Sequence, residues 1–370
     1  MAGLVTFVIA GCPKKPDDEI KVGAYLSLSG PDSTFGSDNR EGIELAVTEQ
    51  NAKGGIKGKK IRVLYEDDKS KTQEASQKVM QLADRDEVVA ILGEAASSRS
   101  LAGGLVANSK GVPMITPSST AVEVTKDREW VFRTCFTDAQ QGKAAARYVR
   151  ETLKRERIVV MFAAQDTYSS GLARTFVDAL RDLGAKPILE KGYQKGETSF
   201  RTYLAEIRDA KPDAIFVPSY YNDMVLIARQ AKEVGIAGSL FVGGDGWDST
   251  NLLEGAGAEL EGATFTNHYA PDVPWPHAKQ FLTAFEARFH HAPSGGAAQG
   301  YDAANMLFDA MNRAPKIERR ALRDALAQTK DLAGATGTVT VDTDHNVTKS
   351  VVVVKITNKQ FHYAGEVPGN

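Results

Sequence analysis

Hydroxyl side chains follow two short apolar segments of the chain, and their chemistry suits the binding of a small anion. Residues 88–92 are apolar and β-branched, as is typical of a buried strand, and the serines at 97–98 open a segment with helical spacing. A second apolar segment, 112–115, leads into the Ser-Ser-Thr sequence at 118–120. Because a helix N-terminus offers free N–H groups and a partial positive charge, this arrangement predicts a carboxylate site. The alternative is that these residues only cap a helix and form a turn.

Further polar and aromatic candidates come directly after other predicted strands. We predict strands at 20–26, 158–162, 214–217 and 240–242, and each is followed by a polar loop. The carboxyl ends of parallel strands meet at one edge of a sheet, where ligands bind. The side chains that these loops bring to that edge are Phe35, Tyr168, Tyr221 and Asp245.

The order of these elements predicts an α/β fold in two lobes. Strands alternate with helices of ten or more residues, which indicates a parallel sheet with helices on both faces. The alternation starts again at about residue 138. A chain of 370 residues is long enough for two domains. We therefore expect a ligand cleft between two lobes, each with a polar edge.

Composition and motifs argue against several classes of function. The formal net charge is -2, and no basic block indicates nucleic-acid binding. The sequence lacks a dinucleotide fingerprint, a phosphate loop and a GxSxG nucleophile motif. The six histidines have no metal-ligand spacing with cysteine or carboxylate. We expect a protein that is not an enzyme, with no cofactor, no metal and no nucleic-acid partner.

The N-terminal residues resemble the end of a bacterial lipoprotein signal. An apolar run leads to Ile-Ala-Gly-Cys at 9–12, and the positively charged leader of a signal peptide does not precede it. We expect lipidation at Cys12, a polar tether up to residue 19, and the start of the fold near Ile20. The alternative is a disordered start with a chance cysteine. Cys135, the other cysteine, lies among apolar residues and is expected to be an inert packing residue.

Several motifs in one order resemble the leucine/isoleucine/valine-binding proteins of bacterial ABC importers, which are type I periplasmic binding proteins. The resemblance extends from about residue 20 to the C-terminus. It implies two Rossmann-like lobes joined by three crossovers, with 20–138 and 267–345 in lobe 1 and 139–266 and 346–366 in lobe 2. The motifs that carry it are Ser29-Gly30-Pro31, residues 51–58, Ser97-Ser98, residues 117–120, residues 165–168, Tyr220-Tyr221 and residues 243–247.

The resemblance also implies a binding site for an amino acid. Ser97 and Thr120 would hold the ligand carboxylate, while the Ser118 carbonyl and Asp245 would hold the ammonium group. Donors at one end and a charged acceptor at the other suit a zwitterion. The family often has small residues at positions 118 and 119 and a longer acid at 245, so the side-chain preference stays open. The implied ligand-binding residues are Phe35, Ser97, Ser118, Ser119, Thr120, Tyr168, Tyr221 and Asp245.

Three of these assignments have a structural alternative. Asp245 stands between glycines and could simply form a turn. Phe35 could belong to the core instead of the cavity wall. Neighbouring residues on a strand face opposite ways, so we expect only one of Tyr220 and Tyr221 to face the cleft, and we select Tyr221.

The expected function is that of a periplasmic or cell-surface lipoprotein, anchored to the membrane by its lipid alone. It would be a monomer that closes by a hinge around an amino acid, aliphatic or branched-chain, and delivers it to the membrane permease of an ABC importer. Another small amphiphile, such as an amide, a urea or an aromatic acid, is an alternative ligand. A ligand sensor for a signalling partner is an alternative role. The sequence does not rank leucine, isoleucine, valine, alanine and phenylalanine.

Overall fold

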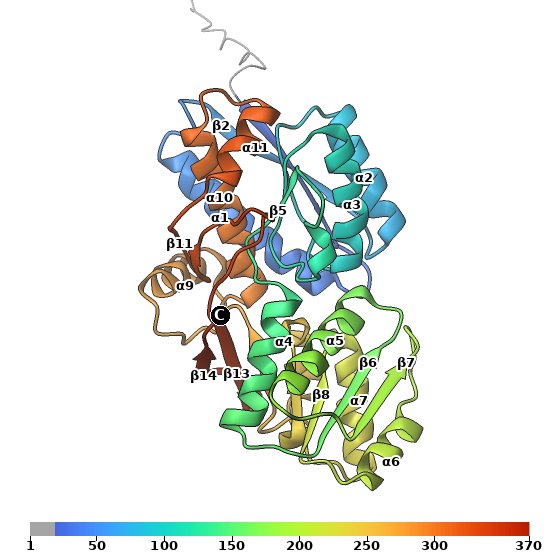
Figure 1. The fold of residues 1–370 in the computed structure, drawn as a ribbon. Coiled ribbons are helices and arrows are strands. Elements are labelled where there is room, and N and C mark those ends of the chain that lie inside the picture. Colours follow the sequence, from blue (N-terminus) through green and yellow to red (C-terminus); the bar gives the residue numbers. More distant parts are fainter. Residues whose placement is uncertain (1–18, 370) are drawn as a thin grey trace, which may run out of the picture.

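The computed structural model describes residues 19–369, whose strands form two main sheets that lie in two lobes (Figure 1). The first lobe is built on a parallel five-stranded sheet in the order β2-β1-β3-β4-β5. Its strands are β1 (Glu19–Leu26), β2 (Lys60–Asp67), β3 (Ile91–Leu92), β4 (Met114–Thr116) and β5 (Val131–Arg133). The predicted strand at 88–92 is therefore short, with only its last two residues in the ladder.

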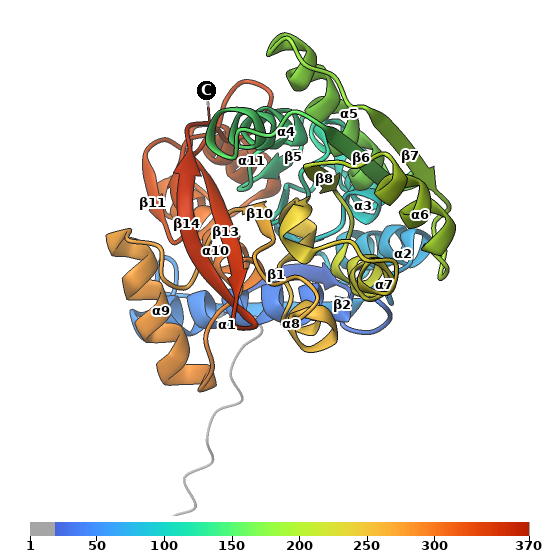
Figure 2. The same cartoon turned by 90° about the horizontal axis from the view of Figure 1, so that it is seen from below.

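The second lobe is built on a seven-stranded sheet in the order β14-β13-β10-β9-β8-β6-β7. The C-terminal hairpin of β13 and β14 is the antiparallel part of this otherwise parallel sheet and forms one edge, while β7 forms the other (Figure 2). The strands are β6 (Ile158–Ala163), β7 (Leu189–Tyr193), β8 (Ala214–Val217), β9 (Phe241–Gly243), β10 (Thr264–Asn267), β13 (Val351–Thr357) and β14 (Gln360–Val367). A separate small hairpin joins β11 (Leu332–Gly334) to β12 (Gly337–Val339).

Helices cover both faces of each sheet, as the alternation predicts. The first lobe carries α1 (Ser33–Ala52), α2 (Thr72–Asp84), α3 (Ser97–Lys110), α10 (Gly295–Arg313) and α11 (Arg319–Ala327). The second carries α4 (Asp138–Arg147), α5 (Thr167–Asp182), α6 (Arg201–Asp209), α7 (Tyr221–Glu233) and α8 (Thr250–Ala256). The remaining helix, α9 (Pro276–Phe289), lies against α10, with the rings of Phe281 and Tyr301 5.0 Å apart.

Alternating side chains of β1 explain why its sheet needs two helical layers. Val22 and Leu26 pack into the apolar cluster formed with α1 and α10, while Tyr25 packs into the cluster formed with α2 and α3. All three are fully buried. A strand with both faces covered is apolar throughout, which is the pattern that the sequence shows there.

The chain passes between the lobes three times, after β5, after β10 and before β13, and these connections lie close together. The rings of Phe136 and His268 stack at 3.6 Å, which joins the first segment to the second. The backbone N–H of Arg133, the last residue of β5, donates to the His345 carbonyl at 3.3 Å, which ties the third segment to the end of the first sheet. The exact residue boundaries of the two lobes, as given above, stay a prediction.

Two expectations concern the rest of the chain. Cys135 is fully buried, and burial raises the pKa of its thiol to about 11, as fits an inert packing residue. Cys12 and residues 13–18 of the predicted tether lie outside the described residues, and Glu19 already belongs to β1. Within residues 19–369, no helix is both long and apolar enough to cross a bilayer.

Candidate functional site

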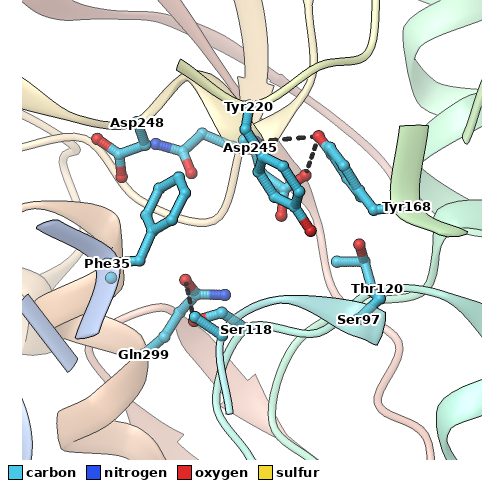
Figure 3. Close-up of a pocket in the computed structure, with 13 residues that line it drawn as sticks. Phe35, Ser97, Ser118, Thr120, Tyr168, Tyr220, Asp245, Asp248 and Gln299 are labelled. Carbon is cyan, nitrogen blue, oxygen red and sulfur yellow. Dashed lines mark hydrogen bonds between the residues drawn. The ribbon is translucent and has the colours of Figure 1, made fainter. Parts of the chain in front are cut away.

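A small cavity lies between the lobes, where loops after strands of both sheets meet (Figure 3). Hydroxyl side chains of the first lobe, at Ser97 and Thr120, lie on one side of it, and Asp245 of the second lobe lies on the other. Six of the eight predicted binding residues line this cavity. The lining residues are Phe35, Ala95, Ser97, Ser118, Thr120, Tyr168, Tyr220, Asp245, Gly246, Asp248, Asn267, Gly296 and Gln299.

Thr120 and Ser97 offer hydrogen-bond donors to the cavity. The Thr120 side chain is 1% exposed, and its hydroxyl oxygen makes no hydrogen bond of normal geometry to the described residues, although it lies close enough to the Asp138 carboxyl to lower the pKa of that group. Ser97 begins α3, where the first backbone N–H groups have no partner within the helix. Its hydroxyl does not cap that helix, because the N-cap position is Ala96 and the Ser97 oxygen accepts from the N–H of Ala121 at 3.2 Å. That leaves the Ser97 O–H free to donate to an anion.

Asp245 is held by donors of the second lobe. Its Oδ1 accepts from the Tyr168 hydroxyl at 2.8 Å and from Nε2 of Gln141 at 2.9 Å. Its Oδ2 lies 3.4 Å from Nε2 of His268. A Cβ at position 246 would lie 2.7 Å from the Ser219 carbonyl, so the glycine lets the loop after β9 pack closely enough to aim the carboxylate.

The groups around Asp245 carry no compensating charge. His268 is fully buried against Phe136, and desolvation lowers its pKa, so its ring is neutral at pH 7. Burial, together with the charge of Asp245, raises the pKa of Asp138 well above its usual range. Among the ion pairs of the described residues, Asp245 meets no lysine or arginine. A carboxylate in this setting favours a cationic ligand group.

The aromatic cover comes from Tyr168 and Tyr220, whereas Tyr221 is placed elsewhere, which corrects the choice made from the sequence. The Tyr220 ring stacks on Tyr168 at 4.9 Å and lines the cavity. Tyr221 begins α7, and its hydroxyl donates to the Pro31 carbonyl of the first lobe at 2.7 Å. Tyr220 is the last residue before that helix, so the turn sends the two side chains in different directions.

Ser119 and Phe35 have structural roles that the sequence does not distinguish from binding. Ser119 is fully buried and does not line the cavity; its hydroxyl bonds to Ser100 Oγ at 2.7 Å and to the Ala95 carbonyl at 2.9 Å. Phe35 lines the cavity and also belongs to an apolar cluster, with its ring 5.1 Å from that of Tyr221. Phe35 therefore lines the cavity and also belongs to the hydrophobic core.

Three polar lining residues did not emerge from the sequence: Asp248, Asn267 and Gln299. Asn267 ends β10, so the strand-end signal that led to Asp245 could have found it. Asp248 accepts from the Gly295 N–H at 2.6 Å, and burial raises the pKa of its carboxyl to about 6. Gln299 comes from α10, and nothing in its local sequence separates it from other helical residues.

Two α/β lobes with a small polar cavity between their strand ends define a two-lobed ligand receptor. A family model described as periplasmic binding protein matches residues 19–360. The chain belongs to that family.

Named relatives have similar length and fold. The Leu/Ile/Val-binding protein of Escherichia coli K12 is 32% identical over 279 residues, which cover 75% of each chain. The leucine-binding protein LivK of Thermotoga maritima superposes with a TM-score of 0.89 at 32% identity, covering 94% of this chain and 99% of that one. LivJ of Streptococcus pneumoniae, solved in complex with isoleucine, gives a TM-score of 0.88 at 32% identity with the same coverage.

Proposed function

We propose that this protein is the extracytoplasmic substrate-binding component of an ABC importer and that its ligand is an L-α-amino acid. The observation that carries the proposal is that a hydroxyl donor and a carboxylate, each without a matching partner, face each other across one cavity. On the first lobe, the buried Thr120 hydroxyl lacks a partner; on the second, Asp245 lacks a cationic one. An α-carboxylate and an α-ammonium group on one carbon satisfy both.

The proposed contacts follow the geometry of the two sides. Ser97, Thr120 and the start of α3 hold the carboxylate. Asp245 and the Ser118 carbonyl hold the ammonium group, and the Tyr168 and Tyr220 rings cover the ligand. Since the two halves come from different lobes, a ligand that contacts both favours the closed arrangement by hinge motion. Relatives named for binding leucine, isoleucine and valine support an amino acid of this size.

The remaining parts of the proposal concern location and partners. We propose that the chain works outside the cytoplasm as a monomer, is anchored by lipid on Cys12, and hands its ligand to a membrane permease without chemical change. Incorporation of labelled fatty acid into the full chain, and its loss in Cys12→Ser, tests the anchor. An unlabelled wild-type chain would refute it.

A thermal-shift screen tests the ligand class. Purified protein is heated with each proteinogenic amino acid and with matched analogues that lack the amine or carry an amide in place of the carboxylate. A ligand at a hundredfold excess over its Kd adds about 2.7 kcal/mol to the stability of the folded state. We expect shifts with intact amino acids only. If only the amine-free acids raise the melting temperature, the cavity is still a binding site, but the ammonium contact proposed for Asp245 is refuted.

A further inference from the structure

Gln299 lines the cavity at the end opposite Ser97 and Thr120. One of its hydrogen-bonding atoms has no partner. Its side chain is 5% exposed, and its Nε2 has no hydrogen-bond partner among residues 19–369. A buried amide donor without a partner is costly, and a ligand that supplies an acceptor removes that cost. Figure 3 shows this nitrogen directed into the cavity, away from the Ser118 hydroxyl.

Neighbouring residues fix which way the Gln299 amide is turned. Nδ2 of Asn39 donates to the Gly296 carbonyl at 2.8 Å, a contact that only an amide nitrogen can make. The same nitrogen lies 3.4 Å from the Ser118 hydroxyl oxygen, which it approaches as a donor. Ser118 therefore donates its own proton to Gln299 Oε1, at 3.0 Å. This sequence of bonds leaves Nε2 of Gln299 as the free group.

The other polar groups in this part of the cavity are already satisfied. Nδ2 of Asn267 donates to the Tyr269 carbonyl at 2.9 Å, and its Oδ1 accepts from the His268 N–H at 2.8 Å. Asp248 accepts from the Gly295 N–H. Unlike Asn267 and Asp248, Gln299 presents the ligand with an unused hydrogen-bonding atom.

The position of Gln299 assigns it to the ligand side chain. Ser97 and Thr120 lie at one end of the cavity and Phe35 with Gln299 at the other (Figure 3). If the carboxylate and ammonium groups occupy the sites proposed above, the side chain of an L-amino acid extends toward Phe35 and Gln299. The wall there is aromatic on one face and carries an amide donor on the other.

We propose, on the basis of the proposed function, that Gln299 is a specificity-determining residue that selects amino acids whose side chain carries a hydroxyl or carboxamide oxygen over aliphatic ones of the same shape. The substrate class is thus threonine-like or asparagine-like. Phe35 and Tyr220 give the apolar part of such a side chain its packing surface, which keeps branched aliphatic amino acids as weaker ligands.

Pairs of isosteric ligands separate the amide contact from size. Titration calorimetry on the purified full chain compares L-threonine with L-valine and L-asparagine with L-leucine, which differ in polarity at nearly constant shape. We expect the polar member to bind about tenfold more tightly in each pair, the usual worth of one buried hydrogen bond. In Gln299→Leu that ratio falls to about one or inverts.

A matched control and a second variant keep the test sharp. Gln77→Leu makes the same change at an exposed position of α2 and should leave every ratio unchanged. Gln299→Met keeps the length of the side chain but has neither the amide donor nor a strong acceptor, and should also abolish the polar preference if Gln299→Leu does not fold.

The outcomes separate this inference from the proposed function. Wild-type protein that binds valine and leucine at least as tightly as threonine and asparagine, with ratios unchanged in the variants, refutes the role of Gln299 and leaves the amino-acid site intact. Failure to bind these four or any other proteinogenic amino acid refutes both, and binding of other amino acids alone refutes only the role of Gln299.

Discussion

Replacing Asp245 by asparagine removes one charge from the site while keeping its shape. The Oδ1 of the new amide can still accept from Tyr168 and Gln141, which now bond at 2.8 and 2.9 Å. Its nitrogen would take the place of Oδ2, 3.4 Å from the His268 ring nitrogen, which is neutral and able to accept. The scaffold of the loop after β9 should therefore survive, and only the attraction for a ligand cation is lost.

The magnitude follows from the difference between a charge-assisted and a neutral hydrogen bond. A bond to a charged group contributes about 1.5–3 kcal/mol and a neutral one about 1 kcal/mol, so Asp245→Asn should weaken amino-acid binding roughly 2- to 30-fold. Titration calorimetry with the tightest-binding amino acid gives the loss directly. The unliganded protein should melt within a degree or two of wild type.

Two comparisons show whether the effect comes from the ligand ammonium. The matched carboxylic acid without its amine, which should bind wild type weakly, gains nothing from the Asp245 charge and should bind Asp245→Asn no more weakly. Asp178→Asn on α5 makes the same charge change at a carboxylate that is 60% exposed, and should leave affinity unchanged. The reasoning is wrong if Asp245→Asn keeps wild-type affinity, or if the amine-free acid loses as much as the amino acid.

Three further variants test other parts of the structure. Thr120→Val removes an unpaired hydroxyl, so affinity should fall about tenfold with no loss in melting temperature; a destabilised protein would show that the hydroxyl has a structural partner. Tyr221→Phe removes the interlobe bond to the Pro31 carbonyl and should weaken all amino acids alike, about fivefold, while a changed rank order of ligands would place Tyr221 in the site. Burial raises the pKa of Asp38 to about 7, so the folded state keeps a proton that the unfolded chain releases near pH 4, and stability falls as pH rises from 4 to 7. Asp38→Asn should therefore match wild type at pH 4 and be about 4 kcal/mol more stable at pH 8 in denaturant titrations; equal stability at both values would contradict the shift.

The fold and the two ends of the cavity could be predicted because they depend on local signals. A run of apolar β-branched residues followed by a polar loop marks a parallel strand and its ligand-binding end, which led to Thr120 and Asp245. The choice between Tyr220 and Tyr221 depends on where α7 begins, and helix starts are not fixed by composition to one residue.

Gln299 shows the other limit of sequence reasoning. It comes from a helix that follows the second passage between the lobes, and it lies 179 positions after Thr120, its neighbour across the cavity. Only the packing of α10 against α1 brings it to the cavity. Ser119 illustrates the reverse case, because its type suits binding while its buried bond to Ser100 serves the loop itself.

The three segments that join the lobes have a mechanical consequence. A single flexible linker would leave each lobe free to twist, slide and bend relative to the other. Three connections restrict such motions more than one would, and here the first is stacked on the second through Phe136 and His268 while the third is bonded to the end of β5 through His345 and Arg133, which favours bending as the relative motion of the lobes. The outer surfaces of the two lobes then take a different relative orientation when the lobes close. A partner protein that contacts both surfaces can therefore distinguish the liganded from the unliganded protein without contacting the ligand.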